Sequence, residues 1–257
     1  MLTSRTWKNA IVFLIGWVVT THSVANLVEL IAKSKPSVVI VGTDSPTDNP
    51  RFTVRGAGFV VGSGNSVVTN AHVLPEAPNN ANVVRRLAIQ LPGKPGEWEL
   101  RMASVISVDR NRDLALLRIE GPAAPALSLG SATYVPEGTD VALIGFPIGG
   151  ALGYSPVTHR GMVSSVTALA PPMPSAQQLN SQAIHRLRQG SYDIYQLDAT
   201  AYPGNSGGPL LNTQTGEVIG VVNSVFVKGS KESALSQPSG ITYAIPVRFV
   251  IELMERR

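Results

Sequence analysis

The sequence contains no cysteine, so disulfide bonds, a thiol nucleophile and cysteine-ligated metals are excluded together. Histidine is also scarce, and no two of the four histidines have the i, i+4 spacing of a metal site on a helix. We therefore expect no metal and no cofactor. The histidines are His22, His72, His159 and His185.

Charged residues are few as well. They make up 15% of the 257 residues, and the 21 basic and 17 acidic residues leave a formal net charge of +4. No basic run is longer than two arginines, which is too diffuse to indicate nucleic acid as a partner. With 44% hydrophobic residues, the chain can bury a substantial core as one large domain or as two closely packed halves.

The N-terminal segment differs from the rest of the chain. Arg5 and Lys8 precede an apolar run at residues 10–19, and small residues occupy the −3 and −1 positions of a signal-peptidase site that ends at Ala25. These features predict a signal peptide at residues 1–25. The mature protein would then be exported to the periplasm or to the outside medium.

A membrane anchor is the alternative for the same segment. Residues 9–28 carry no Asp, Glu, Lys or Arg, and about 20 apolar residues span a bilayer. Several Thr and Ser residues in its second half favour cleavage over retention. A membrane is thus expected as a partner only if this segment is retained, which would anchor the protein in the inner membrane with its remainder facing the periplasm.

Most of the remaining sequence reads as short strands rich in Val, Ile and Leu, separated by clusters of Gly, Pro, Asn or Ser. Many short strands with such punctuation predict an all-β barrel or sandwich. The predicted strands are residues 37–41, 58–61, 67–69, 87–90, 114–119, 140–144, 161–166, 194–197, 218–223 and 241–244.

Two segments are predicted to be helical because their apolar residues recur at helical spacing. They are residues 26–33 and 247–255, and the spacing in the second places Val247, Val250, Ile251 and Met254 on one face. Long loops are expected at residues 75–82, 92–97 and 170–190. The last of these is unusual in a compact domain, so it is either functional or mobile.

The stretch YPGNSGGPLLN, residues 202–212, holds Ser206 among glycines, prolines and asparagines. Such residues form tight turns, and a serine among them ordinarily bonds only to its own backbone. A nucleophilic serine, however, needs a backbone folded so tightly that neighbouring N–H groups point at the oxyanion, and glycines permit that geometry. Partners elsewhere in the chain decide between these interpretations.

His72 and Asp113 are the candidate partners. His72 lies where the apolar run of VVTNAHVL ends, and Asp113 comes directly before residues 114–119. A serine nucleophile needs a base to accept its proton, and that base needs a carboxylate that fixes its tautomer and stabilises the imidazolium. The order His, Asp, Ser is a known arrangement, here with spacings of 113 − 72 = 41 and 206 − 113 = 93 residues.

With these three residues the sequence resembles the chymotrypsin-like double β-barrel proteases, and among them the HtrA/Deg-type bacterial serine proteases. The TNAHV, DLALL and GNSGGPL motifs are highly specific, and they occur in the expected order. The matching segments are GAGFVV at 56, VTNAHVL at 68, RDLALLRI at 112, LGSA at 129, VPEGTDVALIGFPIGG at 135, VTHRGMVSSV at 157, YQLDATAYPGNSGGPLLN at 195, GEVIGVVNS at 216 and GITYAIP at 240.

The resemblance implies a trypsin-like serine protease domain over residues 26–257. Its fold would be all-β, with two packed six-stranded antiparallel barrels at about residues 36–125 and 126–246, a short N-terminal helix and a C-terminal helix at residues 247–257. The implied activity is that of a serine endopeptidase acting on polypeptides. In the implied roles, Ser206 is the nucleophile, His72 the general acid and base, Asp113 the orienting carboxylate, and the N–H groups of Gly204 and Ser206 the oxyanion hole.

The resemblance also locates the specificity pocket. Thr200 takes the position six residues before the serine where trypsin-like members carry an aspartate, so we expect an uncharged, small-to-medium apolar P1 side chain. One strand segment would pair with the substrate backbone and another would form the facing wall. The expected substrate-binding residues are Thr200, Asn223, Ser224, Val225, Gly240, Ile241 and Thr242.

Several departures from the family pattern carry expectations of their own. We expect the protease domain alone, without the one or two PDZ domains of typical members. Asn205 replaces the aspartate that pairs with a new N-terminus in animal relatives, so no such zymogen activation is expected. Residues 170–190 would be the regulatory or specificity loop, whereas His159 and His185 are interpreted as plain strand and loop residues. Relatives are often trimers, which implies a homo-oligomer.

Two functions remain open from the sequence. One is an exported endopeptidase of the cell envelope or the outside medium that works through an acyl-enzyme, in protein quality control or processing. The other is a protease-like module that binds extended polypeptides with little turnover. Inactive relatives usually lose a triad residue, and all three are retained here, which favours the enzyme.

Overall fold

The computed structural model describes most of the chain after its N-terminal segment. The predicted signal peptide and the loop of residues 170–190 lie outside the described part. Within that part, no helix has the length and apolar character needed to cross a bilayer. The described residues are 27–75, 85–94, 96–147, 154–169, 192–223 and 240–256.

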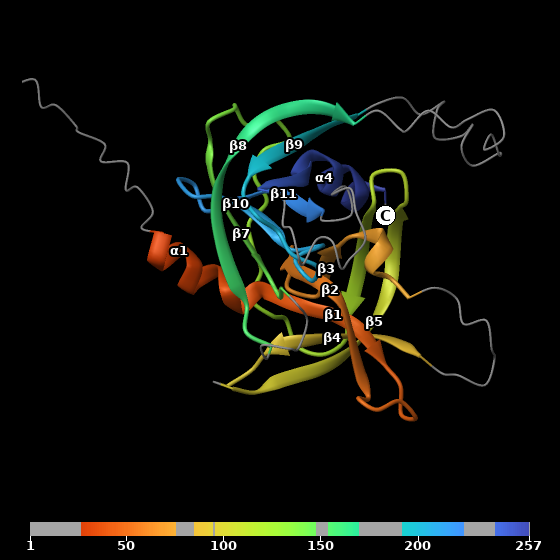
Figure 1. The fold of residues 1–257 in the computed structure, drawn as a ribbon. Coiled ribbons are helices and arrows are strands. Elements are labelled where there is room, and N and C mark those ends of the chain that lie inside the picture. Colours follow the sequence, from red (N-terminus) through yellow and green to blue (C-terminus); the bar gives the residue numbers. More distant parts are fainter. Residues whose placement is uncertain are drawn as a thin grey trace, which may run out of the picture.

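Strands dominate the architecture (Figure 1). The first half contains β1 (Val38–Asp44), β2 (Phe52–Val61), β3 (Ser66–Thr69), β4 (Arg86–Pro92), β5 (Trp98–Asp109) and β6 (Leu114–Ile119). The second half contains β7 (Asp140–Gly145), β8 (Val157–Leu169), β9 (Tyr192–Asp198), β10 (Pro209–Asn212), β11 (Val218–Asn223) and β12 (Ile241–Pro246). Each set closes into an antiparallel barrel, in the orders β1-β2-β3-β6-β5-β4 and β10-β11-β12-β9-β8-β7. The predicted pair of six-stranded barrels is therefore confirmed.

The core has one cluster inside each barrel and a third between the barrels. The alternation of side chains along β1 shows this division, because successive residues of a strand point to opposite faces. Val39 and Val41 join the interior of the first barrel. Val38 and Ile40 instead join a cluster that contains Ile144 of the second barrel. All seven residues of β1 are buried as a result.

Among the described residues, two α-helices flank the barrels: α1 (Leu27–Ser34), which leads through the 3₁₀ turn η1 (Lys35–Ser37) into β1, and α4 (Val247–Glu255), which follows β12. Both were predicted. Two of the four residues that the periodicity placed on one face of α4, Val247 and Val250, are buried. The buried residues of α4 are Val247, Phe249, Val250 and Leu253, whereas Ile251 and Met254 are only half-buried. The helix thus brings apolar residues of the second half of the chain into the cluster between the barrels.

Two strands were missed by the sequence analysis. β5 is half-exposed along most of its length, and a bulge between Val105 and Ser107 shifts its register against β6, so its apolar residues do not alternate regularly. β10 has only four residues and follows directly on the turn that contains Ser206. Neither segment carries enough periodic signal to be recognised as a strand from its sequence.

Candidate active site

His72 is positioned by the abrupt end of β3. After Thr69 the chain passes through Asn70 into a single 3₁₀ turn, η2 (Ala71–Val73), whose first and last residues are buried. The histidine between them points outward, and 33% of its side chain is exposed. Burial of its two neighbours therefore fixes the backbone of His72 while its imidazole remains accessible.

Asp113 lies at the end of the turn between β5 and β6. Its φ of 54° is left-handed, a conformation that aspartate tolerates better than most residues but that still costs about 1 to 3 kcal/mol at a strained site. The conformation is held by its own carbonyl, which accepts the Ala71 N–H at 3.1 Å and the Asn70 Nδ2 amide at 3.0 Å. Both donors belong to the segment that carries His72.

The Asp113 carboxylate is held by three donors. Its Oδ1 accepts the backbone N–H of His72 at 2.8 Å, while its Oδ2 accepts His72 Nδ1 at 2.6 Å and Asn223 Nδ2 at 2.7 Å. Because a carboxylate can only accept, the proton of this pair lies on Nδ1. The other ring nitrogen, Nε2, is then left as the acceptor that a general base needs.

Two consecutive turns hold Ser206. The Asn205 N–H donates to the Tyr202 carbonyl at 3.0 Å, and the Gly208 N–H donates to the Asn205 carbonyl at 3.0 Å. Ser206 itself is buried, with 5% of its surface exposed. Gly207 follows it with a φ of +86°, a conformation that side-chain-bearing residues rarely adopt. The turn thus requires glycine at position 207.

The serine turn is packed against the first barrel. The Ala57 N–H of β2 donates to the Ser206 carbonyl at 2.8 Å. A Cβ on Gly207 would lie 2.2 Å from the Ala57 carbonyl oxygen and 2.4 Å from Thr69 Oγ1, so no larger residue fits there. On the other side, the Gly207 N–H donates to the Val222 carbonyl at 2.9 Å. The turn is therefore fixed to both barrels.

Gly56 shows how close the serine turn comes to the histidine segment. A Cβ on this glycine would lie 2.7 Å from the Val73 side chain and 2.9 Å from the Ser206 carbonyl oxygen. The residue after His72 and the backbone of Ser206 therefore pack on the same point of β2. His72, Asp113 and Ser206 thus gather where the two barrels meet.

The predicted pocket residues 240–242, directly before and at the start of β12, differ in exposure. Gly240 and Ile241 are exposed, whereas Thr242 is fully buried and its hydroxyl donates to the Ala199 carbonyl at 2.6 Å. That bond connects β12 to Ala199, the residue before Thr200. Thr200 itself is half-buried. Thr242 therefore stabilises the backbone beside Thr200.

Asn223 has a role that the sequence analysis did not assign. It was predicted to pair with the substrate backbone together with Ser224 and Val225, which lie outside the described residues. In the structure its side chain is fully buried and donates to Asp113 across the two barrels. A strand-terminal asparagine gives no sequence signal for this contact, because the register between the barrels decides which residue it meets.

Burial shifts the pKa of two side chains near these residues. Burial first, and the charges of Asp113 and Asp109 second, raise the pKa of Tyr192 to about 12, so its hydroxyl stays a neutral donor. Burial lowers the pKa of His159, whose ring lies 5.9 Å from that of Tyr202. A neutral imidazole is thus favoured at position 159 in the folded protein.

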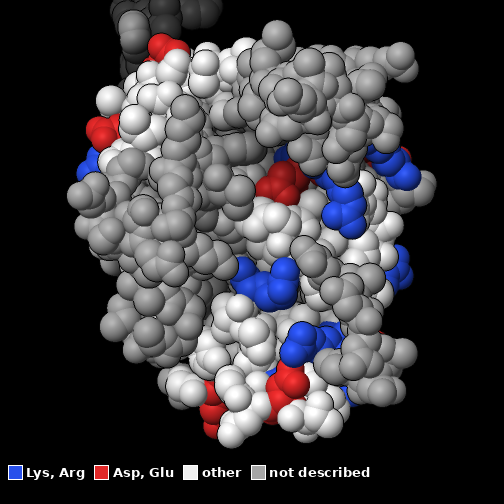
Figure 2. Space-filling model, turned by 45° about the vertical axis from the view of Figure 1, so that its right-hand side comes forward, with Lys and Arg blue, Asp and Glu red and all other residues white. Residues whose placement is uncertain are grey.

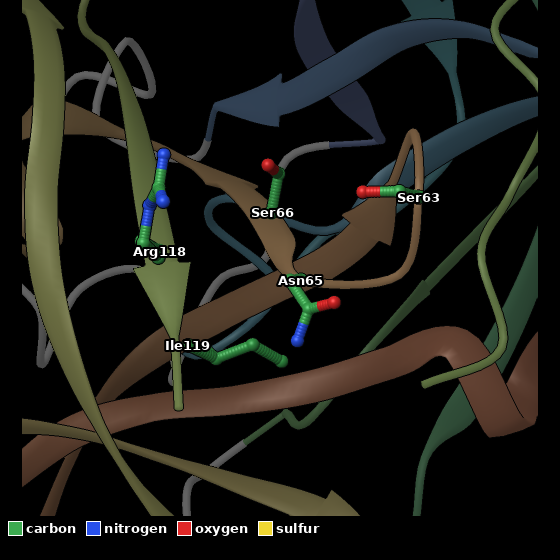
Figure 3. A pocket seen from close by; sticks show the side chains of 5 residues that line it. All are labelled: Ser63, Asn65, Ser66, Arg118 and Ile119. Carbon is green, nitrogen blue, oxygen red and sulfur yellow. The ribbon is translucent and has the colours of Figure 1, made fainter. Parts of the chain in front are cut away.

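The described surface away from His72, Asp113 and Ser206 has two further features, its charge pattern and one hollow. Among the described residues on the face shown in Figure 2, basic and acidic side chains are interspersed. A hollow of about 350 Å³, lined by Ser63, Asn65, Ser66, Arg118 and Ile119, lies at the start of β3 and the end of β6 (Figure 3). His72 and Asp113 lie beyond the opposite ends of these two strands. No group of three or more His, Asp or Glu residues in the described ranges could hold a metal ion.

Comparison with known proteins adds a family to this geometry. The model of the trypsin-like peptidase domain matches residues 56–221. Serine protease HTRA2, mitochondrial, of Drosophila pseudoobscura pseudoobscura is 32% identical over 207 residues, covering 80% of this chain and 40% of the fly protein. Protease Do-like 5, chloroplastic, of Arabidopsis thaliana is 30% identical over 237 residues, covering 87% of this chain and 67% of the plant protein.

The fold has solved counterparts. A crystal structure of Deg5 superimposes with a TM-score of 0.61 at 26% identity, covering 88% of this chain and 90% of that one. The chain spans about 40% of the length of the HTRA2 relatives. The similarity therefore concerns the two-barrel unit.

Proposed function

The chain belongs to the family of trypsin-like peptidase domains, within it to the HtrA/Deg-type serine proteases, and from this membership we propose that it is a serine endopeptidase acting on polypeptides. The observation that carries the proposal is the 2.6 Å hydrogen bond between His72 Nδ1 and Asp113 Oδ2 beside the serine turn. This bond orients a histidine as a general base.

The proposed reaction proceeds through an acyl-enzyme. Ser206 Oγ attacks the scissile carbonyl while His72 Nε2 takes its proton, and His72 then gives that proton to the leaving amine. Water hydrolyses the ester on Ser206 by the same sequence in reverse order. Asp113 stays ionised throughout, and it stabilises the imidazolium that forms on His72.

The oxyanion would be bound by the N–H groups of Gly204 and Ser206. Gly204 has a φ of +103°, and its carbonyl accepts the Phe146 N–H at 3.3 Å, which anchors the turn. Among the described residues, no acceptor is bonded to the Gly204 N–H. A preorganised donor of this kind contributes about 2.7 to 4 kcal/mol to the stability of the transition state.

The substrate proposal follows from the pocket and the N-terminal segment. Thr200 supplies no negative charge, so an uncharged P1 side chain is expected. The proposal that the protein is exported and acts in envelope quality control or processing rests on the signal-like residues 1–25. The names of the relatives do not decide the location, since they include mitochondrial, chloroplastic and probable periplasmic proteases. A retained anchor would change the location while leaving the chemistry as it is.

The test is hydrolysis of an unfolded polypeptide and of quenched-fluorescence peptides with uncharged P1 residues. Wild type should turn over, and Ser206→Ala and His72→Ala should each lose activity to a similar extent because triad members act as a unit. Ser131→Ala is the matched control, because it removes a hydroxyl that bonds only locally to Thr133. Binding without turnover in wild type would overturn the proposal in favour of a polypeptide-binding module.

A further inference from the structure

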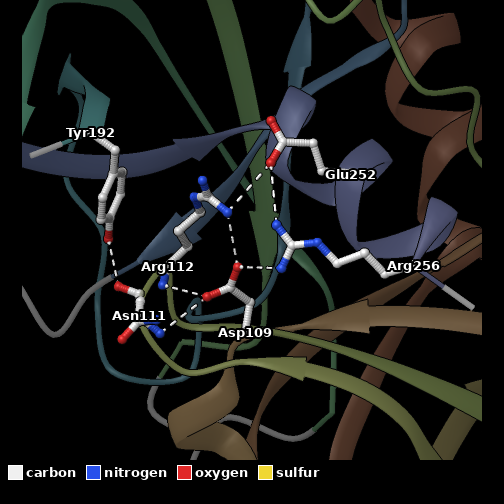
Figure 4. Close-up of polar contacts among 6 residues, drawn as sticks. All are labelled: Asp109, Asn111, Arg112, Tyr192, Glu252 and Arg256. Carbon is white, nitrogen blue, oxygen red and sulfur yellow. Dashed lines mark hydrogen bonds and ion pairs between the residues drawn. The ribbon is translucent and has the colours of Figure 1, made fainter. Parts of the chain in front are cut away.

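The C-terminal helix reaches the turn that leads to Asp113, and Figure 4 shows its contacts with Asp109 and Arg112 of that turn. We propose that α4 acts as a positioning element for Asp113, with Glu252 of the helix and Arg256 at its C-cap holding the turn through Asp109 and Arg112. The inference rests on the function proposed above, and it extends that function to residues outside the triad motifs.

Asp109 organises the turn from its first residue. Its Oδ1 accepts the backbone N–H groups of Asn111 and Arg112, both at 3.1 Å, which fixes the path of the chain toward Asp113. Its Oδ2 is left for cations, and it lies 3.0 Å from Arg112 Nη1 and 3.4 Å from Arg256 Nη1. One carboxylate thus shapes the turn with one oxygen and binds the helix with the other.

The helix contributes a charge of each sign. Arg256 Nη2 lies 3.6 Å from Glu252 Oε2 on the same helix face, and Glu252 Oε2 lies 3.4 Å from Arg112 Nη1. Together with Asp109, these residues form a closed ring of alternating charges between α4 and the turn (Figure 4). Only 8% of the Asp109 side chain is exposed, so its ion pairs are less screened than ordinary surface pairs.

Tyr192 of the second barrel supports these four charged residues through one apolar and one polar contact. The Arg112 guanidinium lies 4.3 Å from the centre of the Phe249 ring of α4, and Tyr192 packs edge-on against the same ring at 5.5 Å. The Tyr192 hydroxyl donates to the Asn111 carbonyl at 3.2 Å. The turn of residues 109–113 is therefore held by both α4 and the start of β9.

This support bears on catalysis because the triad spans two barrels. Asp113 follows β5 of the first barrel in a left-handed conformation, and such strain persists only where the surroundings over-determine it. The bonds to Asn70, Ala71 and His72 hold Asp113 within its own barrel, whereas Asn223, Tyr192 and α4 hold its turn relative to the second barrel. Loosening α4 should therefore misalign the carboxylate while leaving the barrels folded.

Two variants test whether the contacts of α4 position Asp113, and one further variant is the matched control. Asp109→Asn keeps an acceptor for the turn amides but loses the charge, and Arg256→Met removes the cation of the helix. Arg160→Met is the control, since the Arg160–Asp140 pair has the same 3.4 Å separation and a similarly exposed arginine on β8. Arg256→Lys keeps the charge and should restore part of the loss.

Two readouts separate positioning from general stability. The first is the rate of labelling by a fluorophosphonate, with KM for a peptide measured alongside. We expect labelling to slow by about threefold to fivefold in Arg256→Met, because the loss of one partly exposed ion pair lowers the population of the correctly aligned Asp113 by about that factor. Labelling should slow by about tenfold in Asp109→Asn, and KM should be unchanged in both variants. The second is the far-downfield proton resonance of His72 Nδ1–H, which should broaden or shift in both variants and remain unchanged in Arg160→Met.

The outcomes are distinguishable from failure of the proposed function. A wild-type protein that neither reacts with the fluorophosphonate nor hydrolyses peptides would refute the proposed peptidase activity. The His72 Nδ1–H resonance would still show whether α4 positions Asp113. Folded Asp109→Asn and Arg256→Met proteins with wild-type labelling rates and an unchanged resonance would overturn the inference. Equal losses in Arg160→Met would overturn it too, because the effect would then be one of surface charge in general.

Discussion

Replacing Asn223 with leucine separates two roles for the second-barrel residue that meets the triad. Leucine is similar in size but cannot donate, so Asn223→Leu removes the 2.7 Å bond to Asp113 Oδ2. A hydrogen bond to a charged group contributes about 1.5 to 3 kcal/mol. The carboxylate keeps its two bonds to His72 but loses its only described side-chain bond to the second barrel.

The magnitude follows from where that bond acts. If the full contribution of the bond is lost in the transition state, kcat falls by about tenfold to about 100-fold. KM should hardly change, because the Asn223 side chain is fully buried. Asn223→Asp should be worse than Asn223→Leu, because two adjacent carboxylates repel and one of them takes up a proton.

The assay is steady-state hydrolysis of a quenched-fluorescence peptide with an uncharged P1 residue, with urea unfolding measured in parallel. A raised KM with an unchanged kcat would show that the Asn223 side chain does not support Asp113 in the transition state. That result would favour the substrate-backbone role that its sequence position suggested.

Gly207→Ala should lower the free energy of unfolding by several kcal/mol and abolish activity, because its Cβ would lie 2.2 Å from the Ala57 carbonyl oxygen. Gly96→Ala is the matched control, since Gly96 also has a positive φ, +84°, but nothing lies within 4 Å of its Cβ position. This control should lower the free energy of unfolding by only about 1 to 2 kcal/mol. Chemical denaturation measures both. Because burial lowers the pKa of His159, the unfolded chain binds more protons, so this residue reduces stability as pH falls below 6.5. His159→Gln should therefore lose less stability than wild type between about pH 7.5 and pH 5 in urea titrations, and an identical pH dependence would contradict this.

The sequence predicted those features that are local in the chain. The motifs around His72, Asp113 and Ser206 each combine a strand end with a characteristic turn, and the structure places His72 Nδ1 within 2.6 Å of Asp113 Oδ2. Most strands and both helices were equally visible, because their apolar residues recur with the period of the element. Strand β5 was not, because a bulge interrupts its pattern.

Contacts that depend on packing between the barrels were not predictable in this way. Asn223 reaches Asp113 across 110 residues of sequence, and Arg256 reaches Asp109 across 147. Neither spacing nor residue type indicates these pairs, since an asparagine at a strand end and an arginine directly after a helix are common in proteins of any fold. Only the docking of β11 and α4 onto the first barrel decides which partners they meet.

Whether Ser206 is an activated nucleophile can be read by mass spectrometry after treatment with a fluorophosphonate, with the modified residue located by peptide mapping. We expect a single adduct on Ser206 in wild type and none in Ser206→Ala, since only a serine activated by His72 reacts readily. An adduct on another residue, or no adduct on a folded wild-type protein, would contradict the assignment of Ser206, His72 and Asp113 as a working triad.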